Sequence, residues 1–160
     1  MSAIMPTYAP SDLAFERGEG VYLYSVEGKK YLDFCSGIAV TALGHGHPHL
    51  VQALKDQAGK VLHFSNLYRI PAQEKMAERL VEQSFASSVF FCNSGAEAVE
   101  AALKLVRKYQ FQVGHPERYR IISFDGSFHG RTLGAQFLGG INAQKEWIGY
   151  RDQNIFHIRF

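Results

Sequence analysis

Residues 90–104 read FFCNSGAEAVEAALK, and this stretch decides the class of fold. The apolar run Ser87–Cys92 is typical of a short buried strand, and Asn93–Gly95 supplies turn residues after it. From Glu97 to Tyr109 the chain is rich in alanine, with acidic residues near the start and basic residues near the end. That charge order suits the dipole of a helix. The stretch therefore predicts a strand, a turn and a long helix.

The residues that follow continue the pattern. Tyr119–Phe124 is a second candidate for a buried strand, and the glycine-punctuated segment 125–134 comes after it. Residues 139–154 are polar and predict a loop, and Ile155–Phe160 predicts a further strand. Strands and a helix in this order favour an α/β layer with a largely parallel sheet.

The amino-terminal residues predict a smaller α+β lobe. Val21–Ser25 and Lys30–Phe34 are aromatic and β-branched runs joined by VEGK, which is the pattern of a β-hairpin. Gly18 and Gly20 indicate a loop that precedes the hairpin.

Two helices are predicted next, over Pro48–Leu62 and Pro71–Glu82, because apolar residues recur there at helical spacing and each begins with proline. A domain boundary is expected near residues 66–71. The prediction is an amino-terminal lobe over residues 1–70 and the start of a larger α/β domain over residues 71–160.

Composition and charge exclude several classes of protein. Lys and Arg number 17 and Asp and Glu number 15, so the net charge of +2 gives no electrostatic reason to expect nucleic acid or an acidic membrane as a partner. The longest uncharged run, Phe34–Leu54, contains histidine, glycine and proline and does not predict a membrane helix. Two cysteines and a start without a secretion signal favour a reduced, cytoplasmic protein.

The turn at Ser94, Gly95 and Ala96 is the first candidate site. Four N–H groups at a helix start lack partners within the helix, so this turn can bind a phosphate or a carboxylate. The same residues also suit a plain helix cap, in which Ser94 or Asn93 caps the first turn and Glu97 completes a capping box. The local pattern leaves both interpretations open.

The segment 125–132, DGSFHGRT, is the second candidate site. Loops at the carboxyl ends of parallel strands bind ligands in α/β proteins. Phe128 can present a ring face to a planar molecule, and Arg131 can hold a carboxylate with two hydrogen bonds. A core phenylalanine and a surface arginine remain the alternative.

A third feature is the histidine cluster His45, His47 and His49. Glycine-rich packing before a helix explains it better than a metal site, because no cysteine or acidic residue stands near it in the sequence. No metal is therefore predicted. Apolar residues flank Cys35 and Cys92, which predicts inert, buried thiols.

Together these segments resemble the class III aminotransferases, which use pyridoxal 5′-phosphate (PLP). Within that class the SGIAVTALGH stretch is most similar to the branch that acts on acetylornithine and succinylornithine. The resemblance runs from about Tyr8 onward and is carried by five stretches: YLDFCSGIAVTALGHGHP, HFSNLYRIPAQEKMAERL, VFFCNSGAEAVEAALKLVRKY, IISFDGSFHGRTLG and IFHIRF.

The resemblance assigns roles by position. It implies that the Gly95 and Ala96 backbone binds the PLP phosphate, with Ser94 beside them, and that Phe128 stacks on the pyridine ring. Arg131 would bind the α-carboxylate of the substrate. The position of Ala96 is often threonine in relatives, and alanine removes one side-chain contact while both N–H groups remain.

The resemblance also implies the type I PLP-dependent transferase fold and a homodimer. The reaction would transfer the terminal amino group of N2-acetyl-L-ornithine to 2-oxoglutarate, in arginine biosynthesis. Succinylornithine, ornithine and 4-aminobutyrate enzymes of the class share most of these motifs and are the alternatives, together with a non-catalytic fragment that binds an anion or PLP.

The chemistry of the class needs a Schiff-base lysine and an aspartate in a DE-x-Q stretch, and neither motif occurs in residues 1–160. No catalytic residue is therefore assigned. The chain is expected to be the amino-terminal portion of a longer enzyme and to be inactive alone, without Schiff-base absorbance.

Overall fold

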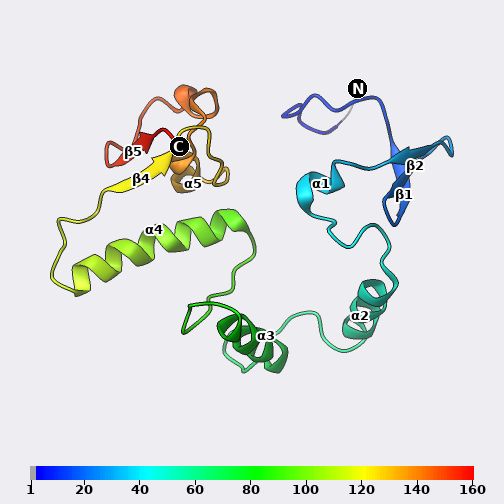
Figure 1. Ribbon diagram of the computed structural model, residues 1–160, viewed down its shortest axis with the longest axis horizontal. Coiled ribbons are helices and arrows are strands. Elements are labelled where there is room, and N and C mark those ends of the chain that lie inside the picture. Colours follow the sequence, from blue (N-terminus) through cyan, green and yellow to red (C-terminus); the bar gives the residue numbers. More distant parts are fainter. Residues whose placement is uncertain (1–2) are drawn as a thin grey trace. The chain divides into compact units, whose positions relative to one another are not determined.

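The computed structural model describes residues 3–160, and these divide into two units on either side of the boundary between Ile70 and Pro71. Figure 1 traces their elements in chain order. Both units mix helices with strands. Among the described residues, no helix combines the length and apolar character that crossing a membrane would need.

The first unit contains an antiparallel sheet in the order β1-β2-β3, formed by Phe15–Glu19, Tyr22–Ser25 and Lys30–Leu32. The hairpin predicted from VEGK is confirmed, with Tyr22 opposite Leu32 in the ladder. The loop predicted at Gly18 is wrong, because Gly18 pairs with Leu23 inside β1. A side chain at position 18 would meet the His45 ring at 2.5 Å, so glycine is there for close packing.

Two helical segments follow in the same unit, α1 (Ser36–Ala39) and α2 (Pro48–Ala58). The prediction that α2 reaches Leu62 is wrong, since the helix ends before Gly59, whose flexible backbone favours termination. The short α1 turn has left-handed backbone angles throughout, with φ from +49° to +63°. Left-handed turns cost L-residues about 1–2 kcal/mol each.

The second unit begins with α3 (Pro71–Glu82) and α4 (Gly95–Gln112). The strands β4 (Ile121–Phe124) and β5 (Ile155–Ile158) pair in parallel, as predicted. Between them lie α5 (Leu133–Leu138) and two short 3₁₀ turns in the segment predicted to be a loop, η1 and η2, at Asn142–Gln144 and Glu146–Ile148. In Figure 1, α5 lies beside the amino-terminal half of α4.

The strand predicted over Ser87–Cys92 is wrong. That segment has no strand conformation, and within the described residues the parallel sheet contains only β4 and β5. A strand needs a neighbour to receive its backbone hydrogen bonds, and no described segment pairs with this one.

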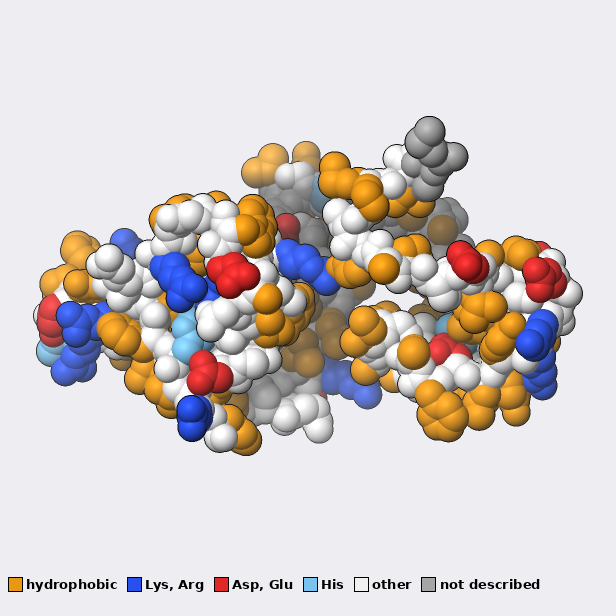
Figure 2. Space-filling view, turned by 90° about the horizontal axis from the view of Figure 1, so that it is seen from above, with side chains coloured by type: hydrophobic (Ala, Val, Ile, Leu, Met, Phe, Trp, Pro, Cys, Tyr) orange, Lys and Arg blue, Asp and Glu red, His pale blue; other side chains and the backbone are white. Residues whose placement is uncertain are grey.

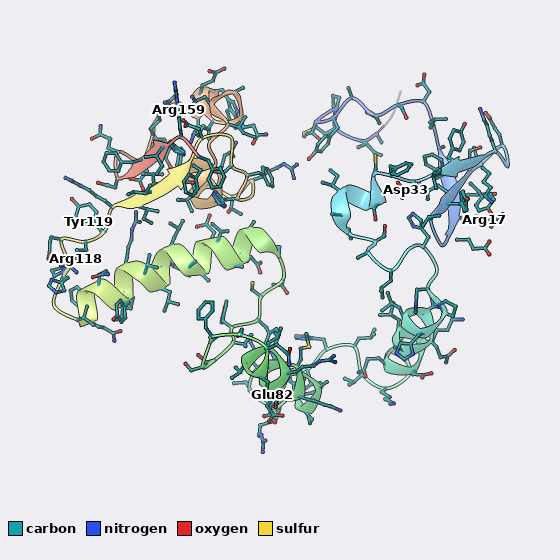
Figure 3. All side chains as sticks on the ribbon, viewed as in Figure 1. Arg17, Asp33, Glu82, Arg118, Tyr119 and Arg159 are labelled. Atoms are coloured by element: carbon teal, nitrogen blue, oxygen red, sulfur yellow. The ribbon has the colours of Figure 1, made fainter. Side chains whose placement is uncertain are left out.

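An arginine on α4 ties the helix to the sheet. Arg107 donates from Nε to the Tyr119 carbonyl at 3.3 Å and lies 3.5 Å from Asp152. Figure 3 shows Arg118 and Tyr119 on the connection between α4 and β4. The contact fixes the approach of the chain to β4.

Little apolar surface is buried in either unit. Within residues 3–160, the buried apolar residues all belong to α5 and are Ala135, Phe137 and Leu138. Apolar side chains are spread over the surface seen in Figure 2, and on α4 Leu105 is 68% exposed. The region around α5 is therefore the part of the second unit in which apolar side chains are buried.

Candidate functional site

Ser94 caps the start of α4. Its backbone is extended, and its Oγ accepts the Glu97 N–H at 3.2 Å. In return the Glu97 carboxylate accepts the Asn93 N–H at 2.7 Å. Of the two interpretations left open for this turn, the cap accounts for the hydroxyl of Ser94.

The cap leaves two donors uncommitted. Among the described residues, the N–H groups of Gly95 and Ala96 have no protein acceptor. They lie in the first turn of an 18-residue helix, where the dipole is positive. The anion-binding interpretation therefore applies to these two backbone groups, beside the serine cap.

The segment that carries Phe128 and Arg131 comes very close to this turn. A Cβ on Gly130 would lie 2.7 Å from the Ala96 Cβ, and the φ angle of Gly130 is +126°. Both observations require glycine, because L-residues rarely adopt that angle and the space is already filled. Gly130 thus joins the two candidate segments, which are 34 positions apart.

An open pocket of about 680 Å³ lies at this junction. Its lining combines the first turn of α4 with the second segment, and consists of Gly95, Ala96, Val99, Phe128, His129, Gly130, Arg131 and Thr132. Four of the five predicted site residues therefore lie around one pocket. Ser94 does not line it.

The aromatic and cationic groups of the pocket lie together. The Arg131 guanidinium carbon is 5.3 Å from the centroid of the Phe128 ring, and this ring is about half exposed. A cation within about 6 Å of a ring is attracted to its face. The pocket thus offers two backbone donors, an accessible ring and a guanidinium.

Glu100 is a residue of this region that the sequence interpretation missed. Its Oε1 accepts the Thr132 hydroxyl at 2.6 Å and the Ala135 N–H at 3.1 Å. The hydrogen bond from Thr132 is the main reason that the pKa of Glu100 is lowered, and the N–H groups of Ala135 and Gly134 lower it further. Burial raises this pKa, but by less than the Thr132 hydrogen bond lowers it. The sequence signal that could have pointed to Glu100 is its position four residues after Ala96, on the same face of α4.

Beneath the pocket, hydrogen bonds support the turn that precedes Phe128. Ser123 Oγ, on β4, lies 3.2 Å from His129 Nε2 and 3.3 Å from Ser127 Oγ. The Gly140 N–H donates to the Ser127 carbonyl at 2.9 Å. These bonds hold the loop at the carboxyl end of β4, where parallel strands position ligand loops.

Lys145 is buried, with 4% of its surface exposed. Its Nζ donates to the Phe137 carbonyl at 3.0 Å and to the Gly139 carbonyl, and lies 3.1 Å from His157 Nε2. Burial lowers the pKa of this amine, and the charge of Arg151 lowers it further. Lys145 lines a separate cavity of about 90 Å³ rather than the pocket of Phe128 and Arg131.

In the first unit, His45 pairs with an acidic residue that is distant in sequence. Its Nε2 lies 2.7 Å from Asp33 Oδ2, and Asp33 Oδ1 accepts the Cys35 and Ser36 N–H groups at 3.0 and 2.9 Å. The hydrogen bond to His45 is the main reason that the pKa of Asp33 is lowered. Figure 3 shows Asp33 beside α1.

No group of three metal-binding side chains is found among residues 3–160. The expectation of buried thiols is wrong, since Cys35 and Cys92 are both exposed. Their apolar neighbours in sequence are themselves exposed, Phe34 at 91% and Phe91 at 37%, so those neighbours do not form a core around the sulfur atoms.

Comparison with known proteins gives one family. Residues 4–150 match the family described as Aminotransferase class-III. The acetylornithine aminotransferase of Agrobacterium fabrum is 52% identical over 157 residues, which cover 98% of this chain and 39% of that protein. Acetylornithine aminotransferase 1 of Bradyrhizobium diazoefficiens is 62% identical over 130 residues, or 81% of this chain and 32% of that protein.

A solved structure shows the same fold. The (S)-enantioselective omega-transaminase from Thermomicrobium roseum superposes with a TM-score of 0.90 at 30% identity, over 99% of this chain and 38% of that one. The chain thus spans about two-fifths of the length of these relatives or less.

Proposed function

The chain belongs to the class III aminotransferase family, and we propose that it forms the phosphate-binding and carboxylate-binding part of an acetylornithine aminotransferase. The single observation that carries the proposal is the pocket in which the free amides of Gly95 and Ala96 meet Phe128 and Arg131. The identity to curated acetylornithine aminotransferases over nearly the whole chain supports the choice of substrate.

The residues present fit pyridoxal 5′-phosphate. Two unpaired N–H groups at the positive end of α4 suit its phosphate, and the exposed Phe128 ring suits its planar pyridine. When bound, this cofactor supplies an electron sink for the carbon that carries the substrate amine. Lys145 is no candidate for attaching the cofactor, because its amine donates hydrogen bonds to backbone carbonyls in another cavity.

The chain's own residues bind and orient. The backbone N–H groups of Gly95 and Ala96 would donate hydrogen bonds to the phosphate, and the Phe128 side chain would pack against the ring. Arg131 would pair with the α-carboxylate through two parallel hydrogen bonds, which would leave the distal amine of acetylornithine as the end free to react. The DE-x-Q stretch that the resemblance implies does not occur in residues 1–160, and we expect it and the Schiff-base lysine in a part of the protein that this chain does not span.

Further properties belong to the same proposal. We expect a cytoplasmic homodimer whose substrates are acetylornithine and 2-oxoglutarate, without nucleic-acid or membrane partners, since the net charge is only +2. Succinylornithine, ornithine and 4-aminobutyrate are the competing amino donors.

The test uses the protein encoded by the complete reading frame that contains residues 1–160. Formation of glutamate from 2-oxoglutarate is measured with each of the four amino donors, and acetylornithine is expected to give the highest kcat/KM. Arg131→Ala is expected to raise the KM for acetylornithine tenfold or more while the cofactor stays bound. An unchanged KM would contradict the role of Arg131, and a preference for another donor would contradict the choice of substrate.

A further inference from the structure

One face of α4 contacts the second site segment at two successive turns. Ala96 lies against Gly130, and Glu100, one turn later, binds Thr132 and Ala135. The contact at Glu100 is as close as the one at Ala96, because a Cβ on Gly134 would lie 2.3 Å from Glu100 Oε2. The segment that carries Arg131 is therefore attached to the helix that carries the phosphate-binding amides.

Glu100 takes the place of a local cap for α5. Thr132 is the N-cap residue, yet its side chain makes no cap bond and donates to Glu100 instead, at 2.6 Å. The carboxylate also accepts N–H groups of the first turn of α5. An ionised acceptor at this end of a helix suits the helix dipole, and hydrogen bonds to a charged group are the stronger kind.

Arg131 directly precedes Thr132, so the backbone at Arg131 is bounded on both sides by contacts to α4. Gly130 is held against Ala96, and Thr132 is held by Glu100. If either contact is lost, the position of the guanidinium relative to the Gly95 and Ala96 amides is no longer set. A fixed separation matters only for a ligand that binds at both places.

We propose that Glu100 is a positioning residue that sets the distance between the phosphate-binding turn and Arg131. The inference rests on the proposed function, since it takes the phosphate and the carboxylate as the two ends of one ligand. Glu100 itself does not line the pocket, so we expect it to make no contact with the ligand. Its effect passes through the Thr132 hydroxyl and the first turn of α5.

The experiment compares two probes on the ¹⁵N-labelled protein encoded by the complete reading frame that contains residues 1–160, after removal of any bound cofactor. Pyridoxamine 5′-phosphate carries the phosphate and ring without the substrate carboxylate. The stable secondary amine made by reducing the mixture of PLP and N2-acetylornithine carries the carboxylate as well. Dissociation constants come from amide shift changes in NMR titrations. Neither probe needs a lysine or turnover. The ratio of the two constants measures what the acetylornithine part adds to binding, and its loss in Arg131→Ala measures the share of the carboxylate contact.

In the native chain, both probes are expected to shift the Gly95 and Ala96 amides, and the carboxylate probe is expected to bind about tenfold more tightly. Glu100→Gln is expected to reduce this ratio about threefold or more, with the affinity for pyridoxamine 5′-phosphate unchanged. The same substitution is expected to have no further effect on the ratio in a chain that already carries Arg131→Ala. Glu78→Gln, the same change on the exposed surface of α3, is the control.

A second pair of variants keeps the test informative if Glu100→Gln does not fold. Thr132→Val removes the hydroxyl and is expected to lower the ratio, whereas Thr132→Ser retains it and is expected to restore the native value. A merely structural cap would lower the affinity for both probes equally, and that result would overturn the inference.

The remaining outcomes separate the inference from the proposed function. Failure of pyridoxamine 5′-phosphate to shift Gly95 and Ala96 overturns the phosphate site and the inference with it. Equal affinity for both probes in the native chain overturns the role of Arg131 and, again, the inference. An intact tenfold ratio that Glu100→Gln leaves unchanged overturns the role of Glu100 alone.

Discussion

Replacing Gly130 by alanine tests the close approach on which the candidate site depends. The new Cβ would lie 2.7 Å from the Ala96 Cβ, 3.1 Å from the Ala96 Cα and 3.2 Å from the Ala135 Cβ. Carbon atoms pack best at about 3.5–4.0 Å, so the segment must move away from α4 by about 0.8 Å. The φ angle of +126° adds strain, since alanine rarely adopts it.

Both costs can be given a magnitude. Forcing extra carbon into a filled space costs about 1–3 kcal/mol. Holding an L-residue at such a backbone angle adds about 1–3 kcal/mol. We therefore expect Gly130→Ala to lower the free energy of unfolding by about 2–6 kcal/mol. With a urea dependence of about 2 kcal/mol per molar, the midpoint falls by roughly 1–3 M.

The assay is urea unfolding of the 160-residue chain followed by far-ultraviolet circular dichroism. Gly114→Ala is the matched control, because Gly114 also has a positive φ, +85°, but no atom within 4 Å of its built Cβ. The control carries backbone strain without a clash, so its smaller effect isolates the contact with Ala96. Equal midpoints for the two variants would refute the close approach. A Gly130→Ala chain that is unfolded in buffer beside a folded control would agree with it.

Three further predictions concern the rest of the chain. Lys145→Met removes the hydrogen bonds that the Phe137 and Gly139 carbonyls accept from Nζ, of which, among the described residues, only the Gly139 carbonyl keeps a neighbour, His157 Nε2 at 3.1 Å, and it is expected to cost about 1–3 kcal/mol in urea unfolding. Because the folded pKa of Lys145 is lowered, the native chain should gain stability as pH rises from that pKa toward 10.5, and the variant should not. The pKa of Asp33 is lowered, so Asp33 stabilises the fold above its unfolded pKa near 3.8, and this stability should be lost as pH drops through the folded pKa. Asp33→Asn removes the charge opposite His45, so the loss of stability at acid pH, measured by urea unfolding, should be smaller in this variant. Cys35 and Cys92 are exposed, so both should react with a thiol reagent without denaturant, and reaction of fewer than two thiols would contradict the structure.

Sequence patterns predicted the elements that depend on local physics. The hairpin follows from two β-branched runs with a glycine-containing turn, and the limits of α3 follow from a proline at its start and regular apolar spacing. The parallel pairing of β4 and β5 follows from the order of strands and helices. The hairpin and α3 each lie within one short segment that contains the information its conformation needs, whereas the pairing of β4 with β5 joins two segments 34 positions apart and follows from the general order of α/β units.

Other features depend on partners distant in sequence, and these were missed. Ser87–Cys92 has the composition of a strand, but a strand forms only where another segment receives its hydrogen bonds. The pairing of His45 with Asp33 spans 12 positions, and the binding of Thr132 by Glu100 spans 32. Composition around a residue does not reveal such a contact, because the contact depends on how two elements pack.

The site depends both on local sequence patterns and on a contact between distant segments, and a compensating variant tests that contact. Each half was readable locally, as a helix start and as a loop after a strand, but the distance between them is set where Ala96 meets Gly130. Removing the Ala96 Cβ relieves only the shortest of the three contacts that Gly130→Ala creates, since the Ala96 Cα and the Ala135 Cβ remain at 3.1 and 3.2 Å. The double variant Ala96→Gly with Gly130→Ala should therefore recover part of the lost stability relative to Gly130→Ala, and should still unfold before the native chain. Full additivity of the two single changes would mean that the two residues do not touch, and the pocket would lose the contact that brings its two halves together.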